Sequence, residues 1–111
     1  MKRAAVAIAA LGLAAAGSAY AASPVSDVDY LRANRCEGIA AGLGADTSHV
    51  AAFIKAQGAT RMDYILAKGR EAYRQARRET SDANLKPRLN TELATSCAAY
   101  VGQGAKVARS N

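Results

Sequence analysis

Apolar side chains recur every three or four residues along most of the chain, a spacing that places them on one face of an α-helix. Four segments show this pattern, at 26–41, 47–58, 60–79 and 87–101. Glycines and a polar run at 80–84 separate them. No stretch of useful length alternates apolar and polar residues as a β-strand would. The sequence therefore predicts an all-α protein.

The expected helix starts carry residues that typically begin helices. Ser26 is followed three residues later by Asp29, as in a capping box, and Thr60 is followed by Asp63 in the same way. Pro87 stands in the first turn of the last segment, where its missing N–H is tolerated. We expect Ser26 and Thr60 to be N-caps and the last helix to run without a break to the end of its segment.

Amphipathic helices of this length must bury their apolar faces against one another. A small helical bundle of three to four short amphipathic helices is the economical arrangement. Short loops would give it up-and-down connectivity, whereas a bent three-helix arrangement with the second helix across one end fits the same pattern. Gly69 lies in the apolar stripe of the third segment, where glycine lowers helix stability by up to about 1 kcal/mol relative to alanine. We expect it to permit the close approach of a neighbouring helix, with a kink as the alternative.

The first 21 residues have the pattern of a secretory signal peptide rather than of a folded element. Lys2 and Arg3 precede an uncharged apolar run at 4–16, and small residues then offer a cleavage site after Ala21. The apolar run is too short to cross a bilayer, which needs about 20 apolar residues. We expect residues 1–21 to be a bacterial Sec-type signal.

Cleavage at that site would leave one small domain at 22–111, whose tail at 103–111 we expect to be frayed. Loss of Lys2 and Arg3 lowers the formal net charge from +6 to +4, so the mature chain is mildly basic. No second long apolar run follows, and we predict no transmembrane segment in the mature chain. The expected location is the periplasm or the medium.

Export would place the only two cysteines, Cys36 and Cys97, in an oxidising compartment. An even cysteine count in a short exported chain is typical of a disulfide, and two cysteines allow only one pairing. A redox or metal pair is the alternative, but the spacing is not Cys-x-x-Cys and nothing nearby in the sequence supplies further ligands. We expect a disulfide that links the first helix to the last.

The acidic residues show no pattern of an active site. Every aspartate lies at or just before an expected helix start, where it compensates exposed N–H groups and the helix dipole. The glutamates are scattered over separate helices, so no carboxylate pair for acid–base catalysis is visible. A single histidine, His49, excludes a multi-histidine metal site. We predict no catalytic residue, no metal site and no cofactor, and a hydrolase is the function class that the composition disfavours most.

His49 and Met62 are the only histidine and methionine that follow the expected signal. Such a pair can ligate a non-covalent haem inside a helical bundle. The alternative is that His49 is an exposed side chain in the first turn of its helix and that Met62 belongs to the apolar stripe. A small haem or ligand carrier is therefore a minor alternative.

Positive charge is the one feature in excess of structural need. Arg70, Arg74, Arg77 and Arg78 fall within about 100° of arc on the third helix, and like charges four residues apart weaken an isolated helix. Their stems could cover the bundle while their charges meet Glu79, Glu92 or water. The functional interpretation is a docking strip for an acidic protein or an anionic envelope component. Nucleic acid is not expected, because the chain is exported, has few aromatic residues and lacks a recognition motif.

Two further arginines, Arg32 and Arg35, project toward the centre of the apolar stripe of the first helix. Either the stripe is narrower and excludes them, or they pair with acids of another helix. A ligand carboxylate between them is a weaker alternative.

These observations give two main hypotheses of function. The first is a non-catalytic exported protein that binds an acidic partner or an envelope polyanion through the arginine face. The second is a stress or chaperone-like protein that exposes apolar surface when the bundle loosens. The outline of a signal, about 90 helical residues and one disulfide is similar in architecture alone to small periplasmic acid-stress chaperones, and the basic mature charge departs from that resemblance.

Overall fold

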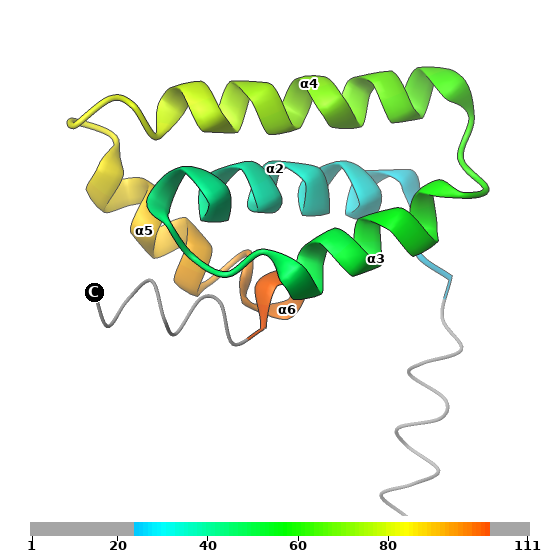
Figure 1. The fold of residues 1–111 in the computed structure, drawn as a ribbon, viewed down its shortest axis with the longest axis horizontal. Helices are drawn as coiled ribbons and strands as arrows, with labels where there is room; N and C mark the ends of the chain where they lie inside the picture. Colours follow the sequence, from blue (N-terminus) through cyan, green and yellow to red (C-terminus); the bar gives the residue numbers. More distant parts are fainter. Residues whose placement is uncertain (1–23, 103–111) are drawn as a thin grey trace, which may run out of the picture.

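The computed structural model describes residues 24–102 (Figure 1). Within that range helix is the one type of regular secondary structure and no strand is present, which confirms the all-α prediction. The expected signal at 1–21 and the expected tail at 103–111 lie outside the described residues. The helices are α2 (Asp27–Leu43), α3 (Ser48–Gly58), α4 (Asp63–Glu79), α5 (Lys86–Ala94) and α6 (Ala98–Val101).

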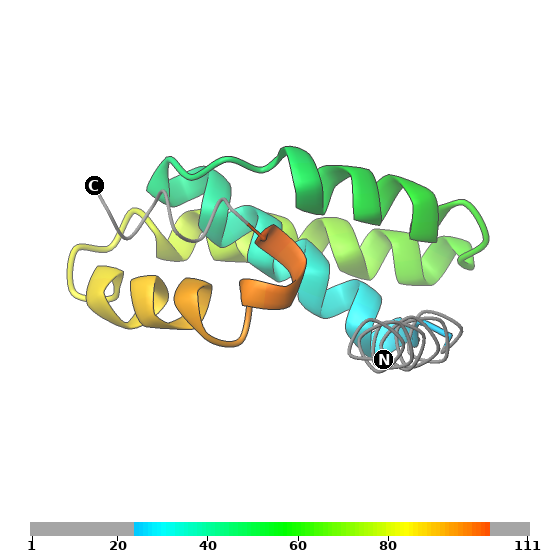
Figure 2. The same cartoon turned by 90° about the horizontal axis from the view of Figure 1, so that it is seen from below.

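Helix α2 lies at the centre of the fold. In Figure 1, α4 runs beside α2 in the same direction, while α3 and α5 run back the other way. The view from below in Figure 2 shows α3 on one side of α2 and α5 on the other, with α6 crossing α2 between them. Both α3 and α4 pack on α2, and α6 packs on α2 and α3. The core lies between these helices, and its largest fully buried side chains are Ile39, Leu89, Leu93, Val50 and Val101 together with the two cysteines.

The first helix begins as the sequence predicts. Ser26 is the N-cap of α2, its hydroxyl accepts from the Asp29 backbone N–H at 3.1 Å, and the Asp29 carboxylate accepts from the Ser26 N–H at 3.4 Å. These two bonds form a capping box.

The predicted N-cap at Thr60 is wrong, because α4 begins at Asp63 with Met62 as its N-cap. The preceding residue, Arg61, is held in the turn by contacts with both neighbouring elements. Its guanidinium donates to Asp27 Oδ1 and to the carbonyl oxygen of Val25, both at 2.8 Å. These bonds tie the turn to the start of α2, and the new helix begins only after it.

The prediction of one unbroken last helix is also wrong. Helix α5 ends at Ala94 and α6 begins at Ala98, with a turn between them. The Thr95 hydroxyl donates to the Thr91 carbonyl oxygen at 2.7 Å, and the Cys97 N–H reaches back five residues to the Glu92 carbonyl oxygen at 3.0 Å. Threonine side chains that bond the preceding turn compete with the regular helical pattern.

The predicted disulfide is present between Cys36 and Cys97, with an S–S distance of 2.06 Å. Cys36 lies on the buried side of α2, and Cys97 is the N-cap of α6, in the turn that follows α5. The bridge therefore fastens the α5–α6 turn to the central helix. Both cysteines belong to the hydrophobic core.

Small residues let α2 and α4 approach closely. A Cβ atom on Gly69 of α4 would stand 2.8 Å from the Asn34 side-chain nitrogen, and one on Gly38 of α2 would stand 2.8 Å from the Ala76 Cβ. A Cβ atom on Gly42 would collide with the Thr80 side chain. The expectation that Gly69 permits close helix packing is therefore confirmed, and two glycines of α2 extend the contact.

We expect Gly38→Ala to lower the free energy of unfolding by about 1 kcal/mol, because the new Cβ would press on the α4 backbone and force the helices apart. In an open helical position, replacing glycine by alanine normally raises the free energy of unfolding by about 0.5–1 kcal/mol. Urea unfolding followed by circular dichroism measures the sign. The reverse change at the exposed Ala67 of α4, Ala67→Gly, is the matched control and should lower stability by about 1 kcal/mol through helix propensity alone. A more stable Gly38→Ala variant would contradict the close packing.

Candidate functional site

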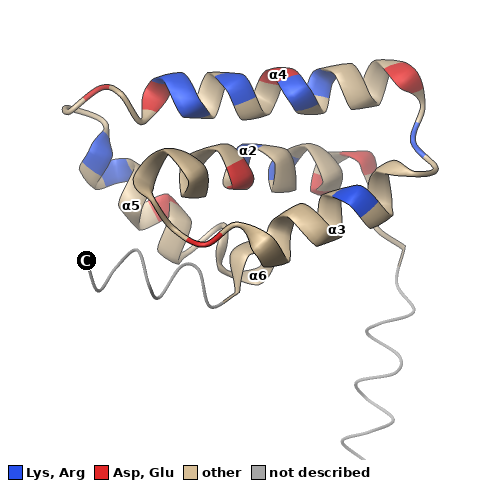
Figure 3. Cartoon of the chain, viewed as in Figure 1, with Lys and Arg blue, Asp and Glu red and all other residues tan. Residues whose placement is uncertain are grey.

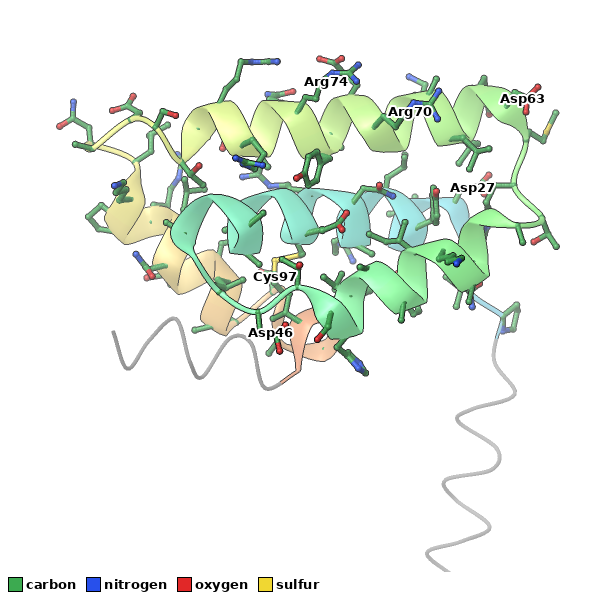
Figure 4. The ribbon with its side chains drawn as sticks, in the orientation of Figure 1. Asp27, Asp46, Asp63, Arg70, Arg74 and Cys97 are labelled. Carbon is green, nitrogen blue, oxygen red and sulfur yellow. A yellow bond between two sulfur atoms is a disulfide. The ribbon has the colours of Figure 1, made fainter. Side chains whose placement is uncertain are left out.

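The four arginines singled out by the sequence lie on the exposed surface of α4. Arg70, Arg74, Arg77 and Arg78 are all exposed, and we call these four residues the basic face. Figure 3 shows the blue bands of positive charge that follow α4, and Figure 4 labels two of the side chains, Arg70 and Arg74. Lys68 adds a fifth exposed cation to the same helix.

One acidic residue, Glu71, lies among these cations and holds two of them. Its carboxylate accepts from Arg74 at 3.0 Å and from Arg78 at 3.4 Å. The hydrogen bonds from Arg74 and then Arg78 lower the pKa of Glu71, so this carboxylate is charged at neutral pH. All three side chains are more than half exposed, so these ion pairs orient the arginines more than they stabilise the fold.

The two remaining arginines of the basic face are placed differently. Arg77 donates to the Tyr73 hydroxyl at 3.0 Å and lies over the Tyr73 ring, 5.9 Å from its centroid. Arg70 forms no hydrogen bond or ion pair with any residue in the described range 24–102.

The glutamates that could have neutralised the basic face are bound elsewhere. Arg35 of α2 donates to Glu92 of α5 at 2.7 and 2.9 Å, and to Glu79 at the end of α4 at 3.0 and 3.3 Å. We call these three residues the Arg35 clamp. The hydrogen bond from Arg35 lowers the pKa of Glu79, and the bonds to Glu92 and Glu79 raise the pKa of Arg35.

The clamp shows which residues pair with Arg35 and which residues do not meet the α4 arginines. Arg35 does pair with acids of other helices, whereas Arg32 is exposed and lies 4.0 Å from Asp29 of its own helix. Glu79 and Glu92 both face Arg35 rather than the α4 arginines, which are exposed to solvent.

A cleft of about 400 Å³ lies beside the basic face, between α2, α3 and α4. Tyr30, Asn34 and Glu37 of α2 contribute to it at positions i, i+4 and i+7, which share one side of a helix. The other helices contribute Ile54 from α3 and Leu66, Arg70, Tyr73 and Arg74 from α4. The basic face and the cleft therefore share Arg70 and Arg74.

The α2 residues of this cleft were not expected to be functional. Asn34 is buried, and its side-chain nitrogen donates to the Tyr30 carbonyl oxygen at 2.9 Å. Glu37 is half-buried, and its burial raises the pKa of its carboxyl group. The spacing of residues 30, 34 and 37 is visible in the sequence, but the cleft depends on how α3 and α4 are placed on α2.

His49 and Met62 are not brought together. His49 lies in the first turn of α3 and Met62 lies beyond its other end, so the length of that helix, about 15 Å, separates them. Met62 is 70% exposed, so the expectation that it belongs to a buried stripe is wrong.

Residues 24–102 contain neither a cluster of metal ligands nor a membrane-spanning helix. These residues contain no group of three or more histidine, cysteine or acidic side chains placed to hold a metal ion. None of the helices formed by these residues has the length and apolar character needed to cross a membrane.

No family model, curated protein or solved structure matches the chain.

Proposed function

We propose that the protein is an exported, non-catalytic binding protein whose basic face attaches to a linear polyanion of the cell envelope. The observation that carries the proposal is the unneutralised charge of α4. Its exposed surface from Lys68 to Arg78 holds five cations and only one acid, Glu71. The carboxylates of Glu79 and Glu92 are bound in the Arg35 clamp.

The spacing of the arginines suits a linear partner. Arg70, Arg74 and Arg78 follow one another at i, i+4 and i+8, and a helix rises about 12 Å over that interval. Glu71 orients the last two, and the planar guanidinium groups match phosphate or carboxylate oxygens in pairs. Orienting these long side chains before binding lowers the entropy lost when a partner is bound.

The composition of the surface favours a polyanion over a folded acidic protein. Interfaces between proteins usually centre on a buried apolar or aromatic cluster. The exposed residues of α4 between Ala67 and Arg78 are charged or polar apart from Ala67 itself. A surface of this kind binds mainly through charge, which a polyphosphate or a similar polymer supplies in a repeating array.

The disulfide and the expected signal support the export of the protein. Disulfides form and persist in oxidising compartments such as the periplasm and the extracellular medium. The Cys36–Cys97 bridge supports such a location, and the expected Sec-type signal at 1–21 is consistent with it.

We expect the triple variant Arg74→Gln, Arg77→Gln, Arg78→Gln to bind polyphosphate at least about tenfold more weakly than the wild type at low salt, because three ionic contacts are lost. Isothermal titration calorimetry at several salt concentrations measures the affinity and its salt dependence, which should become shallower. The matched control, Lys55→Gln, Lys86→Gln, Arg88→Gln, removes the same charge from exposed positions on α3 and α5. Equal losses in the two variants would show that only net charge matters, and that result would overturn the basic face as the binding surface.

A further inference from the structure

Glu37 is a carboxylate that the fold takes partly out of water without supplying a cation. It is half-buried on α2, it lines the cleft between α2, α3 and α4, and it forms no hydrogen bond or ion pair within residues 24–102. Burial raises the pKa of its carboxyl group. Partial burial of an unpaired charge costs free energy, and such groups in clefts are candidates for ligand binding.

Across the cleft, α4 presents the opposite charge. Arg70 has no partner among the described residues, and Arg74 lies one helical turn further along. Neither guanidinium forms an ion pair with Glu37. Arg74 is paired with Glu71, so the cleft offers one carboxylate, Glu37, and one guanidinium, Arg70, that have no partner among the described residues.

The remaining lining is apolar or aromatic, with one buried amide. Ile54 of α3 and Leu66 of α4 are half-buried, and the Tyr30 and Tyr73 rings contribute to the same space. The Asn34 nitrogen is used by the Tyr30 carbonyl, which leaves the Asn34 carbonyl oxygen as an acceptor. A volume of about 400 Å³ lies within the range of small-molecule sites.

We infer that this cleft binds a small zwitterionic molecule with an apolar body, of the class of an apolar amino acid or dipeptide. The ligand ammonium group would lie against Glu37 and the Asn34 carbonyl oxygen, and the ligand carboxylate against Arg70. The ligand side chain would cover Ile54 and Leu66. A simple anion is disfavoured by Glu37 and a simple cation by Arg70, so the combination selects a molecule that carries both charges.

The probe for this inference is leucyl-leucine, titrated into the isotope-labelled protein while backbone amide shifts are recorded by NMR. We expect saturable shifts at the cleft residues of α2, α3 and α4. Glu37→Gln, which preserves the side-chain shape, should weaken binding about tenfold because it removes one charged hydrogen bond. N-acetyl-leucyl-leucine, which lacks the ammonium group, should bind the wild type equally weakly and should lose nothing further in the variant.

The contact between the ligand carboxylate and Arg70 is tested in the same way. Arg70→Gln should weaken binding of leucyl-leucine but should have little effect on its carboxyl-terminal amide, which lacks the carboxylate. Asp63→Asn, at the exposed start of α4, and Arg78→Gln, on the basic face outside the cleft, are the matched controls and should leave the affinity unchanged.

Absence of saturable shifts with leucyl-leucine, or equal affinity for the acetylated probe, would overturn the inference. The proposals for the cleft and for the basic face can be refuted separately. Arg78→Gln should affect polyphosphate binding alone, and Glu37→Gln should affect dipeptide binding alone.

Discussion

Replacing Cys36 and Cys97 together by alanine should lower the free energy of unfolding by about 4 kcal/mol, the value that the chain-entropy model gives for a loop of this length. The two cysteines are 61 residues apart, so the bridge restricts most of the described chain in the unfolded state. Typical domains are stable by about 5–15 kcal/mol, so the loss would be a large fraction of the total.

The structure adds a local reason to the entropic one. Helix α6 has only four residues, too few to be stable alone, and Cys97 precedes it directly. Its Val101 is buried, and the Tyr100 ring meets Phe53 of α3 edge-on at 5.8 Å between centroids. Without the bridge, α6 and its contacts with α3 should loosen first.

Urea unfolding of the oxidised wild type and of the double variant measures this difference. Ser96→Ala changes an exposed neighbour of Cys97 without touching the bridge, and it should stay within about 0.5 kcal/mol of the wild type. A loss of less than about 1 kcal/mol in the double variant would mean that packing rather than the bridge holds the last two helices.

Arg35→Met should lower the free energy of unfolding by about 2 kcal/mol at neutral pH, because it leaves Glu79 and Glu92 facing one another without their cation. Fully buried pairs lose about 3–5 kcal/mol when one partner is removed. The clamp side chains are 19–29% exposed, so water screens part of the loss. Methionine keeps the packing of the arginine stem, and Arg32→Met, at an exposed arginine of the same helix, should change stability by at most about 0.5 kcal/mol.

The pH dependence gives this prediction a second test. The pKa of Glu79 is lowered from its ordinary value of 4.5 by the Arg35 hydrogen bond. Its contribution to stability is therefore complete well above pH 4.5 and is lost as the pH falls through the lowered folded-state pKa. The Arg35→Met variant has no such contribution to lose, so the stability gap should narrow on acidification. A gap that stays constant down to the acid transition would contradict the role given to the clamp.

The expected weakening of the clamp by acid also provides a test of the stress or chaperone-like hypothesis. The clamp joins α2, α4 and α5, so its loss would let apolar faces of these helices separate. If acidification exposed such surface, the wild type would bind a hydrophobic dye at a pH where it keeps its helical signal.

Local signals in the sequence were enough to predict the helical class, the Ser26 capping box, the cysteine pairing and the close approach at Gly69. Each depends on spacing along a single helix or on a count of residue types. The failures at Thr60 and at the last helix have a different origin. Arg61 reaches the start of α2, and the Cys36–Cys97 bridge fixes the α5–α6 turn, so tertiary contacts decide where these helices begin and end.

For the candidate site, too, features on one helix could be predicted from the sequence and features that join helices could not. The basic face could be predicted because its four arginines share one helix, and their spacing alone places them together. The cleft could not, because Glu37 and Arg70 come from different helices and meet only when α3 and α4 are packed on α2. The pairing of Glu79 and Glu92 with Arg35 could not be predicted either, because the sequence does not show which acids of other helices lie near Arg35.

The most direct test of the basic face is an NMR titration of the purified protein with polyphosphate, following the side-chain Nε–Hε signals of its arginines. The signals of Arg70, Arg74, Arg77 and Arg78 should shift together and saturate at one common affinity. The signal of Arg88 on α5 should stay nearly unchanged. Shifts spread evenly over all exposed arginines, or no saturable shift on α4, would contradict the proposal that this helix is the binding surface.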